Sequence, residues 1–236
     1  MRNALTIAAF GLLTAGIMAG PTPIEAQNGD AGTFRITVEG RDVGTDTFNI
    51  RRSGTGTGAV TTAQGRVQLQ LTQATVDRVT ELQVSGVRAA LSRYAAGPPA
   101  GSPGTRIFSS VSGGIFTTEM RTPTGEAMRQ FQVSEGAVVL DEWVAHHYSF
   151  LAQRPRNGQV PIVIPSQNRQ VMGTLESRGE TSIQIGGRSV PAYHLVLRMD
   201  DDPADVRHLW VDSLNRVLRV RIPAQGYEAV RTVAPE

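Results

Sequence analysis

Alternation of apolar and polar residues dominates this chain from residue 34 onward. The run from Phe34 to Val38 is a clear example, with Ile36 apolar between two polar neighbours. Successive side chains of a β-strand point to opposite faces, so this period of two predicts strands with one buried and one solvated face. Runs of this kind, together with shorter apolar runs, predict further strands over residues 43–52, 67–72, 80–84, 87–94, 105–112, 115–121, 127–133, 160–164, 171–177, 181–185, 189–199, 207–212, 216–222 and 227–233.

Short turn sequences separate many of these runs. Pro123-Thr124-Gly125, Gly186-Gly187 and Ser213-Leu214-Asn215 have the composition of tight hairpin turns. The segment 97–104 is rich in glycine and proline and is a candidate mobile loop. Because strands do not alternate with helices, a doubly wound parallel sheet is excluded. We expect a mainly β protein with an antiparallel curved sheet, arranged as a half-barrel or sandwich-like fold.

One segment departs from the period of two. Residues 141–153 have helical spacing, with Asp141 placed to cap the N-terminus and Pro155 to end the helix. The sequence therefore predicts one short helix near 141–153. Its apolar stripe contains Leu140, Trp143, Val144, His147 and Leu151.

The first residues have the pattern of a secretory leader. Arg2 precedes an uncharged apolar run over residues 4–19, and Ile24-Glu25-Ala26 places a small residue at a cleavage position. We expect residues 1–26 to be a signal peptide and residues 27–236 to form a single β domain. The expected location is periplasmic or secreted, with no transmembrane segment after cleavage.

Composition narrows the class of partner. The 236 residues include no cysteine and carry a formal net charge of +2, and all 23 basic residues are arginine. Stability must therefore come from core burial, without disulfides. A net charge near zero gives no general electrostatic footprint for nucleic acid, so we expect no nucleic-acid partner.

The two ends of the domain carry a resemblance. FRITVEGRDVGTDTFNI, with Val43-Gly44, and RHLWVDSLNRVLRVRIPAQGYEAVR, with Trp210-Val211-Asp212, resemble the first and last hairpins of a group of uncharacterised exported bacterial β domains of unknown function. The layout is more distantly similar to the half-barrels of periplasmic lipoprotein carriers, whose concave apolar face holds an acyl chain. The resemblance implies a fold and a compartment, and no catalytic residues.

No motif predicts a catalytic site, a metal site or a cofactor. The glycine-rich segment 54–59 lies between strands, whereas a dinucleotide fingerprint needs a following helix. His146 and His147 are adjacent and would point about 100° apart on a helix, which does not suit one metal ion. The acidic run 200–205 lacks the spacing of a calcium loop and has the composition of a turn.

Aromatic residues are the remaining candidates for a binding site. Trp143, His147 and Tyr148 lie on or near the predicted helix, and Trp210 lies on a predicted strand. These side chains either fill the core or line an apolar cavity beneath a helical lid. We expect a non-catalytic binding module for a lipid, another apolar small molecule or an envelope protein. The alternative is a secreted hydrolase that uses His147 or His208 with a nearby carboxylate.

Overall fold

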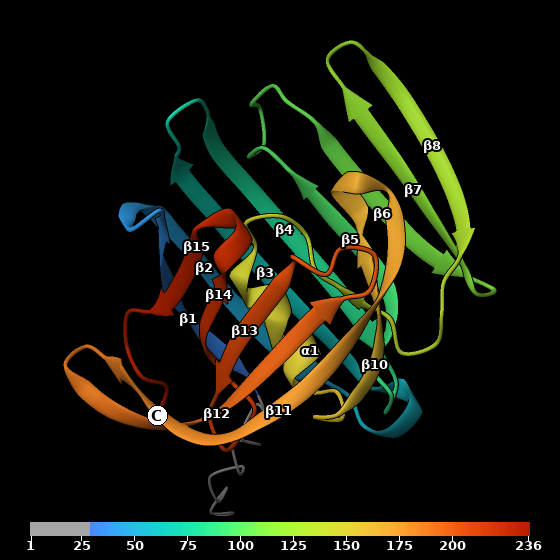
Figure 1. Cartoon of the computed structure of the whole chain (residues 1–236). Coiled ribbons are helices and arrows are strands. Elements are labelled where there is room, and N and C mark those ends of the chain that lie inside the picture. The colour runs from blue at the N-terminus through green and yellow to red at the C-terminus, as the bar shows by residue number, and fades with distance from the viewer. Residues whose placement is uncertain (1–28) are drawn as a thin grey trace, which may run out of the picture.

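Within residues 29–236 the strands form a single curved sheet of 15 strands (Figure 1). The computed structural model describes residues 29–236, so the expected signal peptide lies outside the described residues. The strands are β1 (Asp30–Val38), β2 (Arg41–Ser53), β3 (Val60–Gln70), β4 (Thr75–Ser85), β5 (Ala90–Gly97), β6 (Arg106–Ser112), β7 (Ile115–Thr122), β8 (Gly125–Gln132), β9 (Val138–Val139), β10 (Gly158–Ile164), β11 (Arg169–Ile185), β12 (Arg188–Met199), β13 (Val206–Val211), β14 (Val217–Ile222) and β15 (Tyr227–Arg231).

The strand order shows how the sheet is built. It runs β8-β7-β6-β5-β4-β3-β2-β1-β15-β14-β13-β12-β11-β10-β9. The two ends of the described chain meet in the middle, where β1 pairs with β15, and two meanders extend from there. Every neighbouring pair is antiparallel except β9 and β10, which are parallel. The expected antiparallel curved sheet is confirmed.

The core lies on the concave face of the sheet. In β1 the side chains of Phe34 and Ile36 are fully buried while Arg35 is exposed, as their alternation predicted. A second, smaller cluster contains Ile183, Ile185, Ala192 and Leu218. It lies on the opposite face, because Trp210, which packs against it, alternates along β13 with Leu209 and Val211 of the main core.

Strand β11 is longer than expected because two predicted strands are continuous. The segments 171–177 and 181–185 form one strand of 17 residues with an irregular register between Ser177 and Glu180. Gly179 has a positive φ of 91° at this bulge. A bulge bends a strand without ending it, and Figure 1 shows β11 curving around the body of the protein.

The predicted helix is present but shorter. A 3-10 turn, Ala145–His147, continues into α1, Tyr148–Ala152. Asp141 does not cap it: the residue before the helical segment is Val144, without a side-chain cap. Trp143 has a φ of 66°, in the left-handed region, so the helix cannot extend back to residue 141. Asp141 binds other groups, described below.

Two further boundaries differ from expectation. Residues 86–89 form a turn between β4 and β5, where Gly86 and Ala89 have positive φ values of 72° and 48°, so the strand expected from residue 87 begins at Ala90. The loop 98–104 joins β5 to β6, and the Arg106 guanidinium donates hydrogen bonds to the backbone carbonyls of Pro98, Pro99 and Ser102.

Candidate functional site

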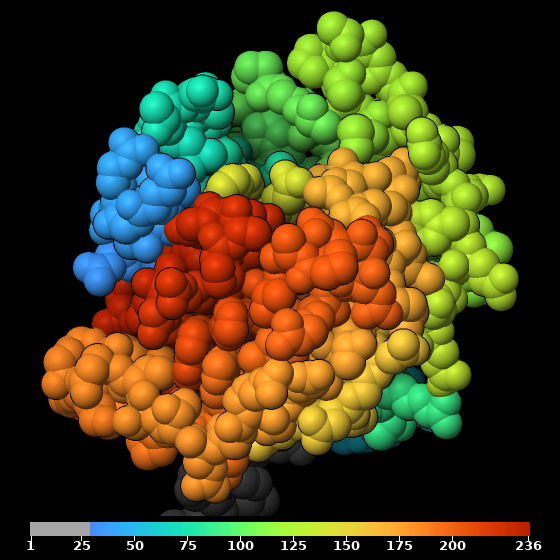
Figure 2. All heavy atoms as spheres, viewed as in Figure 1, coloured from blue at the N-terminus to red at the C-terminus, as the bar shows by residue number. Residues whose placement is uncertain are grey.

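The helical segment 145–152 is enclosed by the curved sheet. Every one of its eight residues is buried. A helix on the outside of a protein has a solvated face, and this segment has none. Strands β11–β15 lie in front of it and hide most of it in the space-filling view (Figure 2). The segment therefore forms a plug within the sheet, and we call residues 145–152 the helical plug.

His146 attaches the plug to two strands. Its Nδ1 lies 2.8 and 2.9 Å from the two carboxylate oxygens of Asp46 on β2, and its backbone N–H donates to Asp46 Oδ2 at 3.0 Å. Its Nε2 lies 3.2 Å from Thr80 Oγ1 on β4. An acid, a histidine and a hydroxyl in this order can activate a nucleophile, but Asp46, His146 and Thr80 are all buried and line neither cavity described below. We interpret the cluster as structural.

The space for the His146 ring comes from Gly65 on β3. A Cβ atom at residue 65 would lie 2.3 Å from His146 Cε1, a separation that real atoms do not reach. The ring also stacks on Phe48, with centroids 5.7 Å apart and planes 9° apart. Position 65 therefore requires glycine because a side chain from the plug occupies its place.

A second buried polar cluster lies around Asp141. Its carboxylate accepts a hydrogen bond from Tyr94 Oη at 2.6 Å and from the backbone N–H groups of Glu142 and Ser166. Arg78 Nη1 is 3.6 Å from it. These bonds explain why Asp141 is unavailable as a helix cap.

His147 is buried against this cluster. Its Nδ1 accepts a hydrogen bond from the Asp141 backbone at 3.4 Å, while its Nε2 has no partner within residues 29–236. Burial holds the pKa of His147 well below its usual value of 6.5, and the nearby His146 and Arg78 lower it further. The ring is therefore neutral at pH 7.

We predict that this histidine makes stability fall in mild acid. A folded-state pKa below 6.5 means that the unfolded chain binds the extra proton, so the stabilisation is present above pH 6.5 and is lost as the pH falls. Between pH 6.5 and 5.5 the free energy of unfolding should drop by about 1 kcal/mol. Urea unfolding of wild type and His147→Gln measures this, and the variant should lose that slope. An equal slope in both proteins would contradict the prediction. His208→Gln is the comparison: the pKa of the partly exposed His208 is lowered less far than that of His147, so this variant should keep most of the slope.

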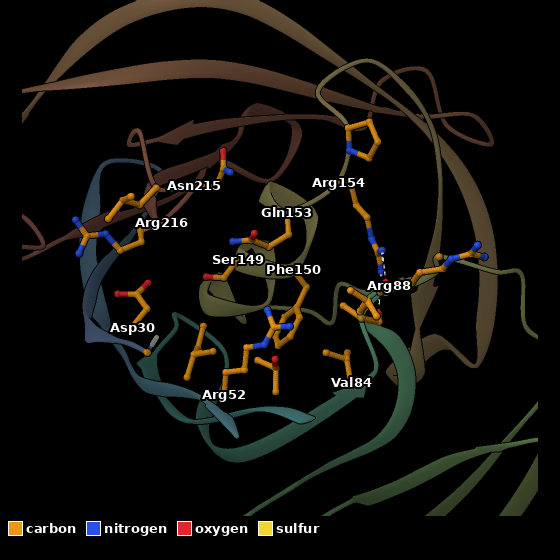
Figure 3. A pocket seen from close by; sticks show the side chains of 18 of the residues that line it. Asp30, Arg52, Val84, Arg88, Ser149, Phe150, Gln153, Arg154, Asn215 and Arg216 are labelled. Carbon is orange, nitrogen blue, oxygen red and sulfur yellow. Dashed lines mark hydrogen bonds between the residues drawn. The ribbon is translucent and has the colours of Figure 1, made fainter. Parts of the chain in front are cut away.

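A cavity of about 830 Å³ lies next to the plug, at one mouth of the curved sheet (Figure 3). Strands β1–β4 supply one wall, the turn 87–89 and residues 135–136 a second, and residues 214–216 a third. Plug residues Ser149 and Phe150, followed by Gln153, lie at its base. We call this space the mouth cavity. Its apolar lining residues are Ile50, Val84, Val87, Ala89, Phe150, Pro155 and Leu214.

Four arginines line the mouth cavity, and they differ in how they are paired. Arg88 pairs with Glu135, and Arg216 pairs with Asp212 at 2.7 Å. Arg154 donates to the backbone carbonyls of Arg88 and Ala89 at 2.9 and 3.1 Å. Arg52 has no hydrogen-bond or ion-pair partner in the described part of the chain. The cavity thus combines an apolar lining with positive charge that is only partly neutralised.

Three of the four expected ligand-binding residues lie close together. Trp143 is partly buried and packs edge-to-face on Tyr227. Trp143 and Tyr148 both line a second, polar cavity of about 210 Å³. The Tyr148 hydroxyl accepts a hydrogen bond from Arg207. His147 is fully buried beside Tyr148 and lines neither cavity.

Trp210 lies apart from the others. It belongs to the cluster on the opposite face of the sheet, where it stacks on His194 with centroids 4.7 Å apart. His194 Nε2 lies 3.0 Å from Nδ1 of His208, and His208 has no hydrogen-bonded carboxylate within residues 29–236. The structure therefore does not bring Trp210 or His208 to the mouth cavity.

Sequence reasoning missed the residues that form the mouth cavity. Arg52, Ser149 and Arg154 carry no motif and come from different elements. One signal in the sequence could have found Arg52. It continues the two-residue alternation of Phe48 and Ile50, which predicts that its side chain lies on the same concave face of the sheet. The helical segment could not be assigned to the cavity without knowing which strands surround it.

Comparison with known proteins adds no assignment to this site. No family model matches the chain, and no curated protein matches it in sequence. Across residues 29–236 the structure contains no helix with the length and apolar character that a bilayer crossing requires. A solved structure similar to the chain is a β-barrel-like protein of Domain of Unknown Function DUF1849 from Brucella abortus. It is 10% identical, with a TM-score of 0.48, over 85% of this chain and 93% of that one.

Proposed function

We propose that this protein is an exported, non-catalytic binding module that holds an apolar or lipid-like ligand in the mouth cavity. The observation that carries the proposal is the cavity itself. Its volume of about 830 Å³ falls within the range of small-molecule sites, roughly 300–1,000 Å³. Its apolar residues face a space that the plug closes at the base, which is the arrangement that buries an apolar ligand.

Export rests on the leader pattern of residues 1–26. Cell fractionation followed by intact-mass measurement tests it. Protein recovered from the envelope should begin at Gln27, and cytoplasmic protein that keeps Met1 would contradict export.

A bulky side chain in the cavity should weaken ligand binding. Thr61 on β3 lines the cavity, so Thr61→Trp should fill it. We predict that the neutral apolar dye N-phenyl-1-naphthylamine binds wild type and binds Thr61→Trp at least about tenfold more weakly, since the apolar contacts with the cavity are lost. Fluorescence titration measures both affinities.

Thr62→Trp is the matched control. It introduces the same side chain one residue further along the strand, where alternation directs it to the opposite face. Dye binding should be unchanged in this variant, and urea unfolding should show that both variants are folded. Equal dye affinity in all three proteins, or no binding to wild type, would contradict the proposed function.

A further inference from the structure

Three side chains that line the mouth cavity have polar atoms without a hydrogen-bond partner among the described residues, and each of these atoms can donate a hydrogen bond. The Ser149 hydroxyl is buried and has no partner in the described structure, and the same holds for Arg154 Nε. The five donors of the Arg52 guanidinium also lack protein acceptors in residues 29–236. Leaving the buried Ser149 and Arg154 atoms without partners is costly, whereas the Arg52 side chain is exposed and its donors face the solvent. This arrangement fits a ligand that enters from the solvent and supplies acceptors.

The carboxylates near the cavity are already paired with arginine side chains. The Asp30 carboxylate, which lines the cavity, binds Arg231, and Glu135 binds Arg88. Arg216 is matched by Asp212. Two positive charges therefore remain without a carboxylate partner, those of Arg52 and Arg154, since Arg154 contacts only backbone carbonyls among the described residues.

The donors lie beside the apolar surface. Figure 3 shows Arg52 extending from β2 toward the plug, where Ser149 and Phe150 occupy adjacent positions. Ile50 and Val84 line the cavity on the same side as Arg52. A ligand with an apolar chain and an anionic end can thus contact both kinds of surface at once.

We infer that the mouth cavity selects anionic amphiphiles, with a carboxylate or phosphate monoester bound by Arg52 and Ser149 and an alkyl chain against Ile50, Val84 and Phe150. The inference rests on the proposed function, because it specifies the chemistry of the same site. Arginine suits this task because its planar guanidinium donates two parallel hydrogen bonds to one carboxylate or phosphate group.

Competition against the neutral dye tests the inference. The competitors share one chain length and differ in the head group: decanoate, decyl phosphate, 1-decanol and decyltrimethylammonium. The ionic competitors are used below their critical micelle concentrations and the alcohol below its solubility limit. Wild type should bind the two anions about tenfold more tightly than the alcohol, as expected for charge-assisted hydrogen bonds, and the cation more weakly still. Arg52→Gln should remove this preference, with the affinity of each competitor calculated from the dye affinity measured for the same variant.

Arg51→Gln is the matched control. Arg51 is the adjacent residue on β2, is exposed, points to the opposite face and binds Asn49. It should keep the full preference for anions. Equal binding of all four competitors to wild type, or an anion preference that persists in Arg52→Gln, would overturn the inference and leave the proposed function standing.

Two further outcomes distinguish a failure of the proposed function from a failure of the anionic-amphiphile inference alone. If neither the dye nor any competitor binds, the proposed function fails, and the inference fails with it. Inorganic phosphate is titrated alone by calorimetry. If it binds as tightly as decyl phosphate, the alkyl chain contributes nothing, and the anionic-amphiphile assignment is overturned in favour of a site for free anions.

Discussion

Replacing Asp46 with alanine is expected to lower the free energy of unfolding by about 3–5 kcal/mol, because two buried polar groups of His146 each lose a partner, at about 1–3 kcal/mol per group. The carboxylate contacts both the ring and the backbone of His146, and all three groups are buried. Without Asp46, the His146 backbone N–H and Nδ1 lose their acceptor and water cannot replace it.

Asp46→Asn provides the comparison. The amide keeps one acceptor oxygen and nearly the same volume, so the loss should be clearly smaller than for Asp46→Ala. Urea unfolding monitored by tryptophan fluorescence measures both variants, and Trp143 reports on the segment next to the plug. A loss below about 1 kcal/mol for Asp46→Ala, typical of a surface substitution, would show that the Asp46–His146 contact does not hold the plug.

Gly65→Ala is expected to lower the free energy of unfolding by about 3 kcal/mol, at the upper end of the range for added bulk in a packed core. The new Cβ would overlap the His146 ring, which Asp46 and Thr80 hold from two sides. Relief of the overlap requires the ring to move and these hydrogen bonds to break.

A double-mutant cycle with His146→Ala separates this cause from a general preference for glycine in the strand. In the His146→Ala background the ring is absent, so adding Gly65→Ala should cost little. Equal costs of Gly65→Ala in both backgrounds would contradict the overlap. Gly58→Ala is the control, because a Cβ at residue 58 would meet nothing within 4 Å.

Much of the sheet could be predicted from the local sequence, because the alternation of apolar and polar residues within a strand shows which of its faces is buried. The alternation around Phe34 and Ile36 and the turns at 123–125 and 186–187 appear in the structure where expected. Boundaries differed where the backbone departs from regular geometry. Because Trp143 has a left-handed φ, the helical segment begins after it and not at residue 141. At Gly179 the chain forms a bulge and not a turn, so two predicted strands are one continuous strand.

The plug and the cavity could not be predicted, because their residues meet only through the fold. Asp46 and His146 are 100 residues apart, and neither position shows its partner in the local sequence. Trp210 is a different case. Its neighbours Leu209 and Val211 belong to the main core, so alternation already placed Trp210 on the opposite face, away from Trp143.

A crystal structure with 10-bromodecanoate would test ligand binding in the mouth cavity most directly, since the anomalous signal of bromine marks the end of the alkyl chain. We expect the bromine peak against Ile50, Val84 and Phe150, with the carboxylate next to Arg52 and Ser149. A peak on the opposite face of the sheet near Trp210, or an empty mouth cavity at a saturating concentration of the fatty acid, would contradict the proposed function.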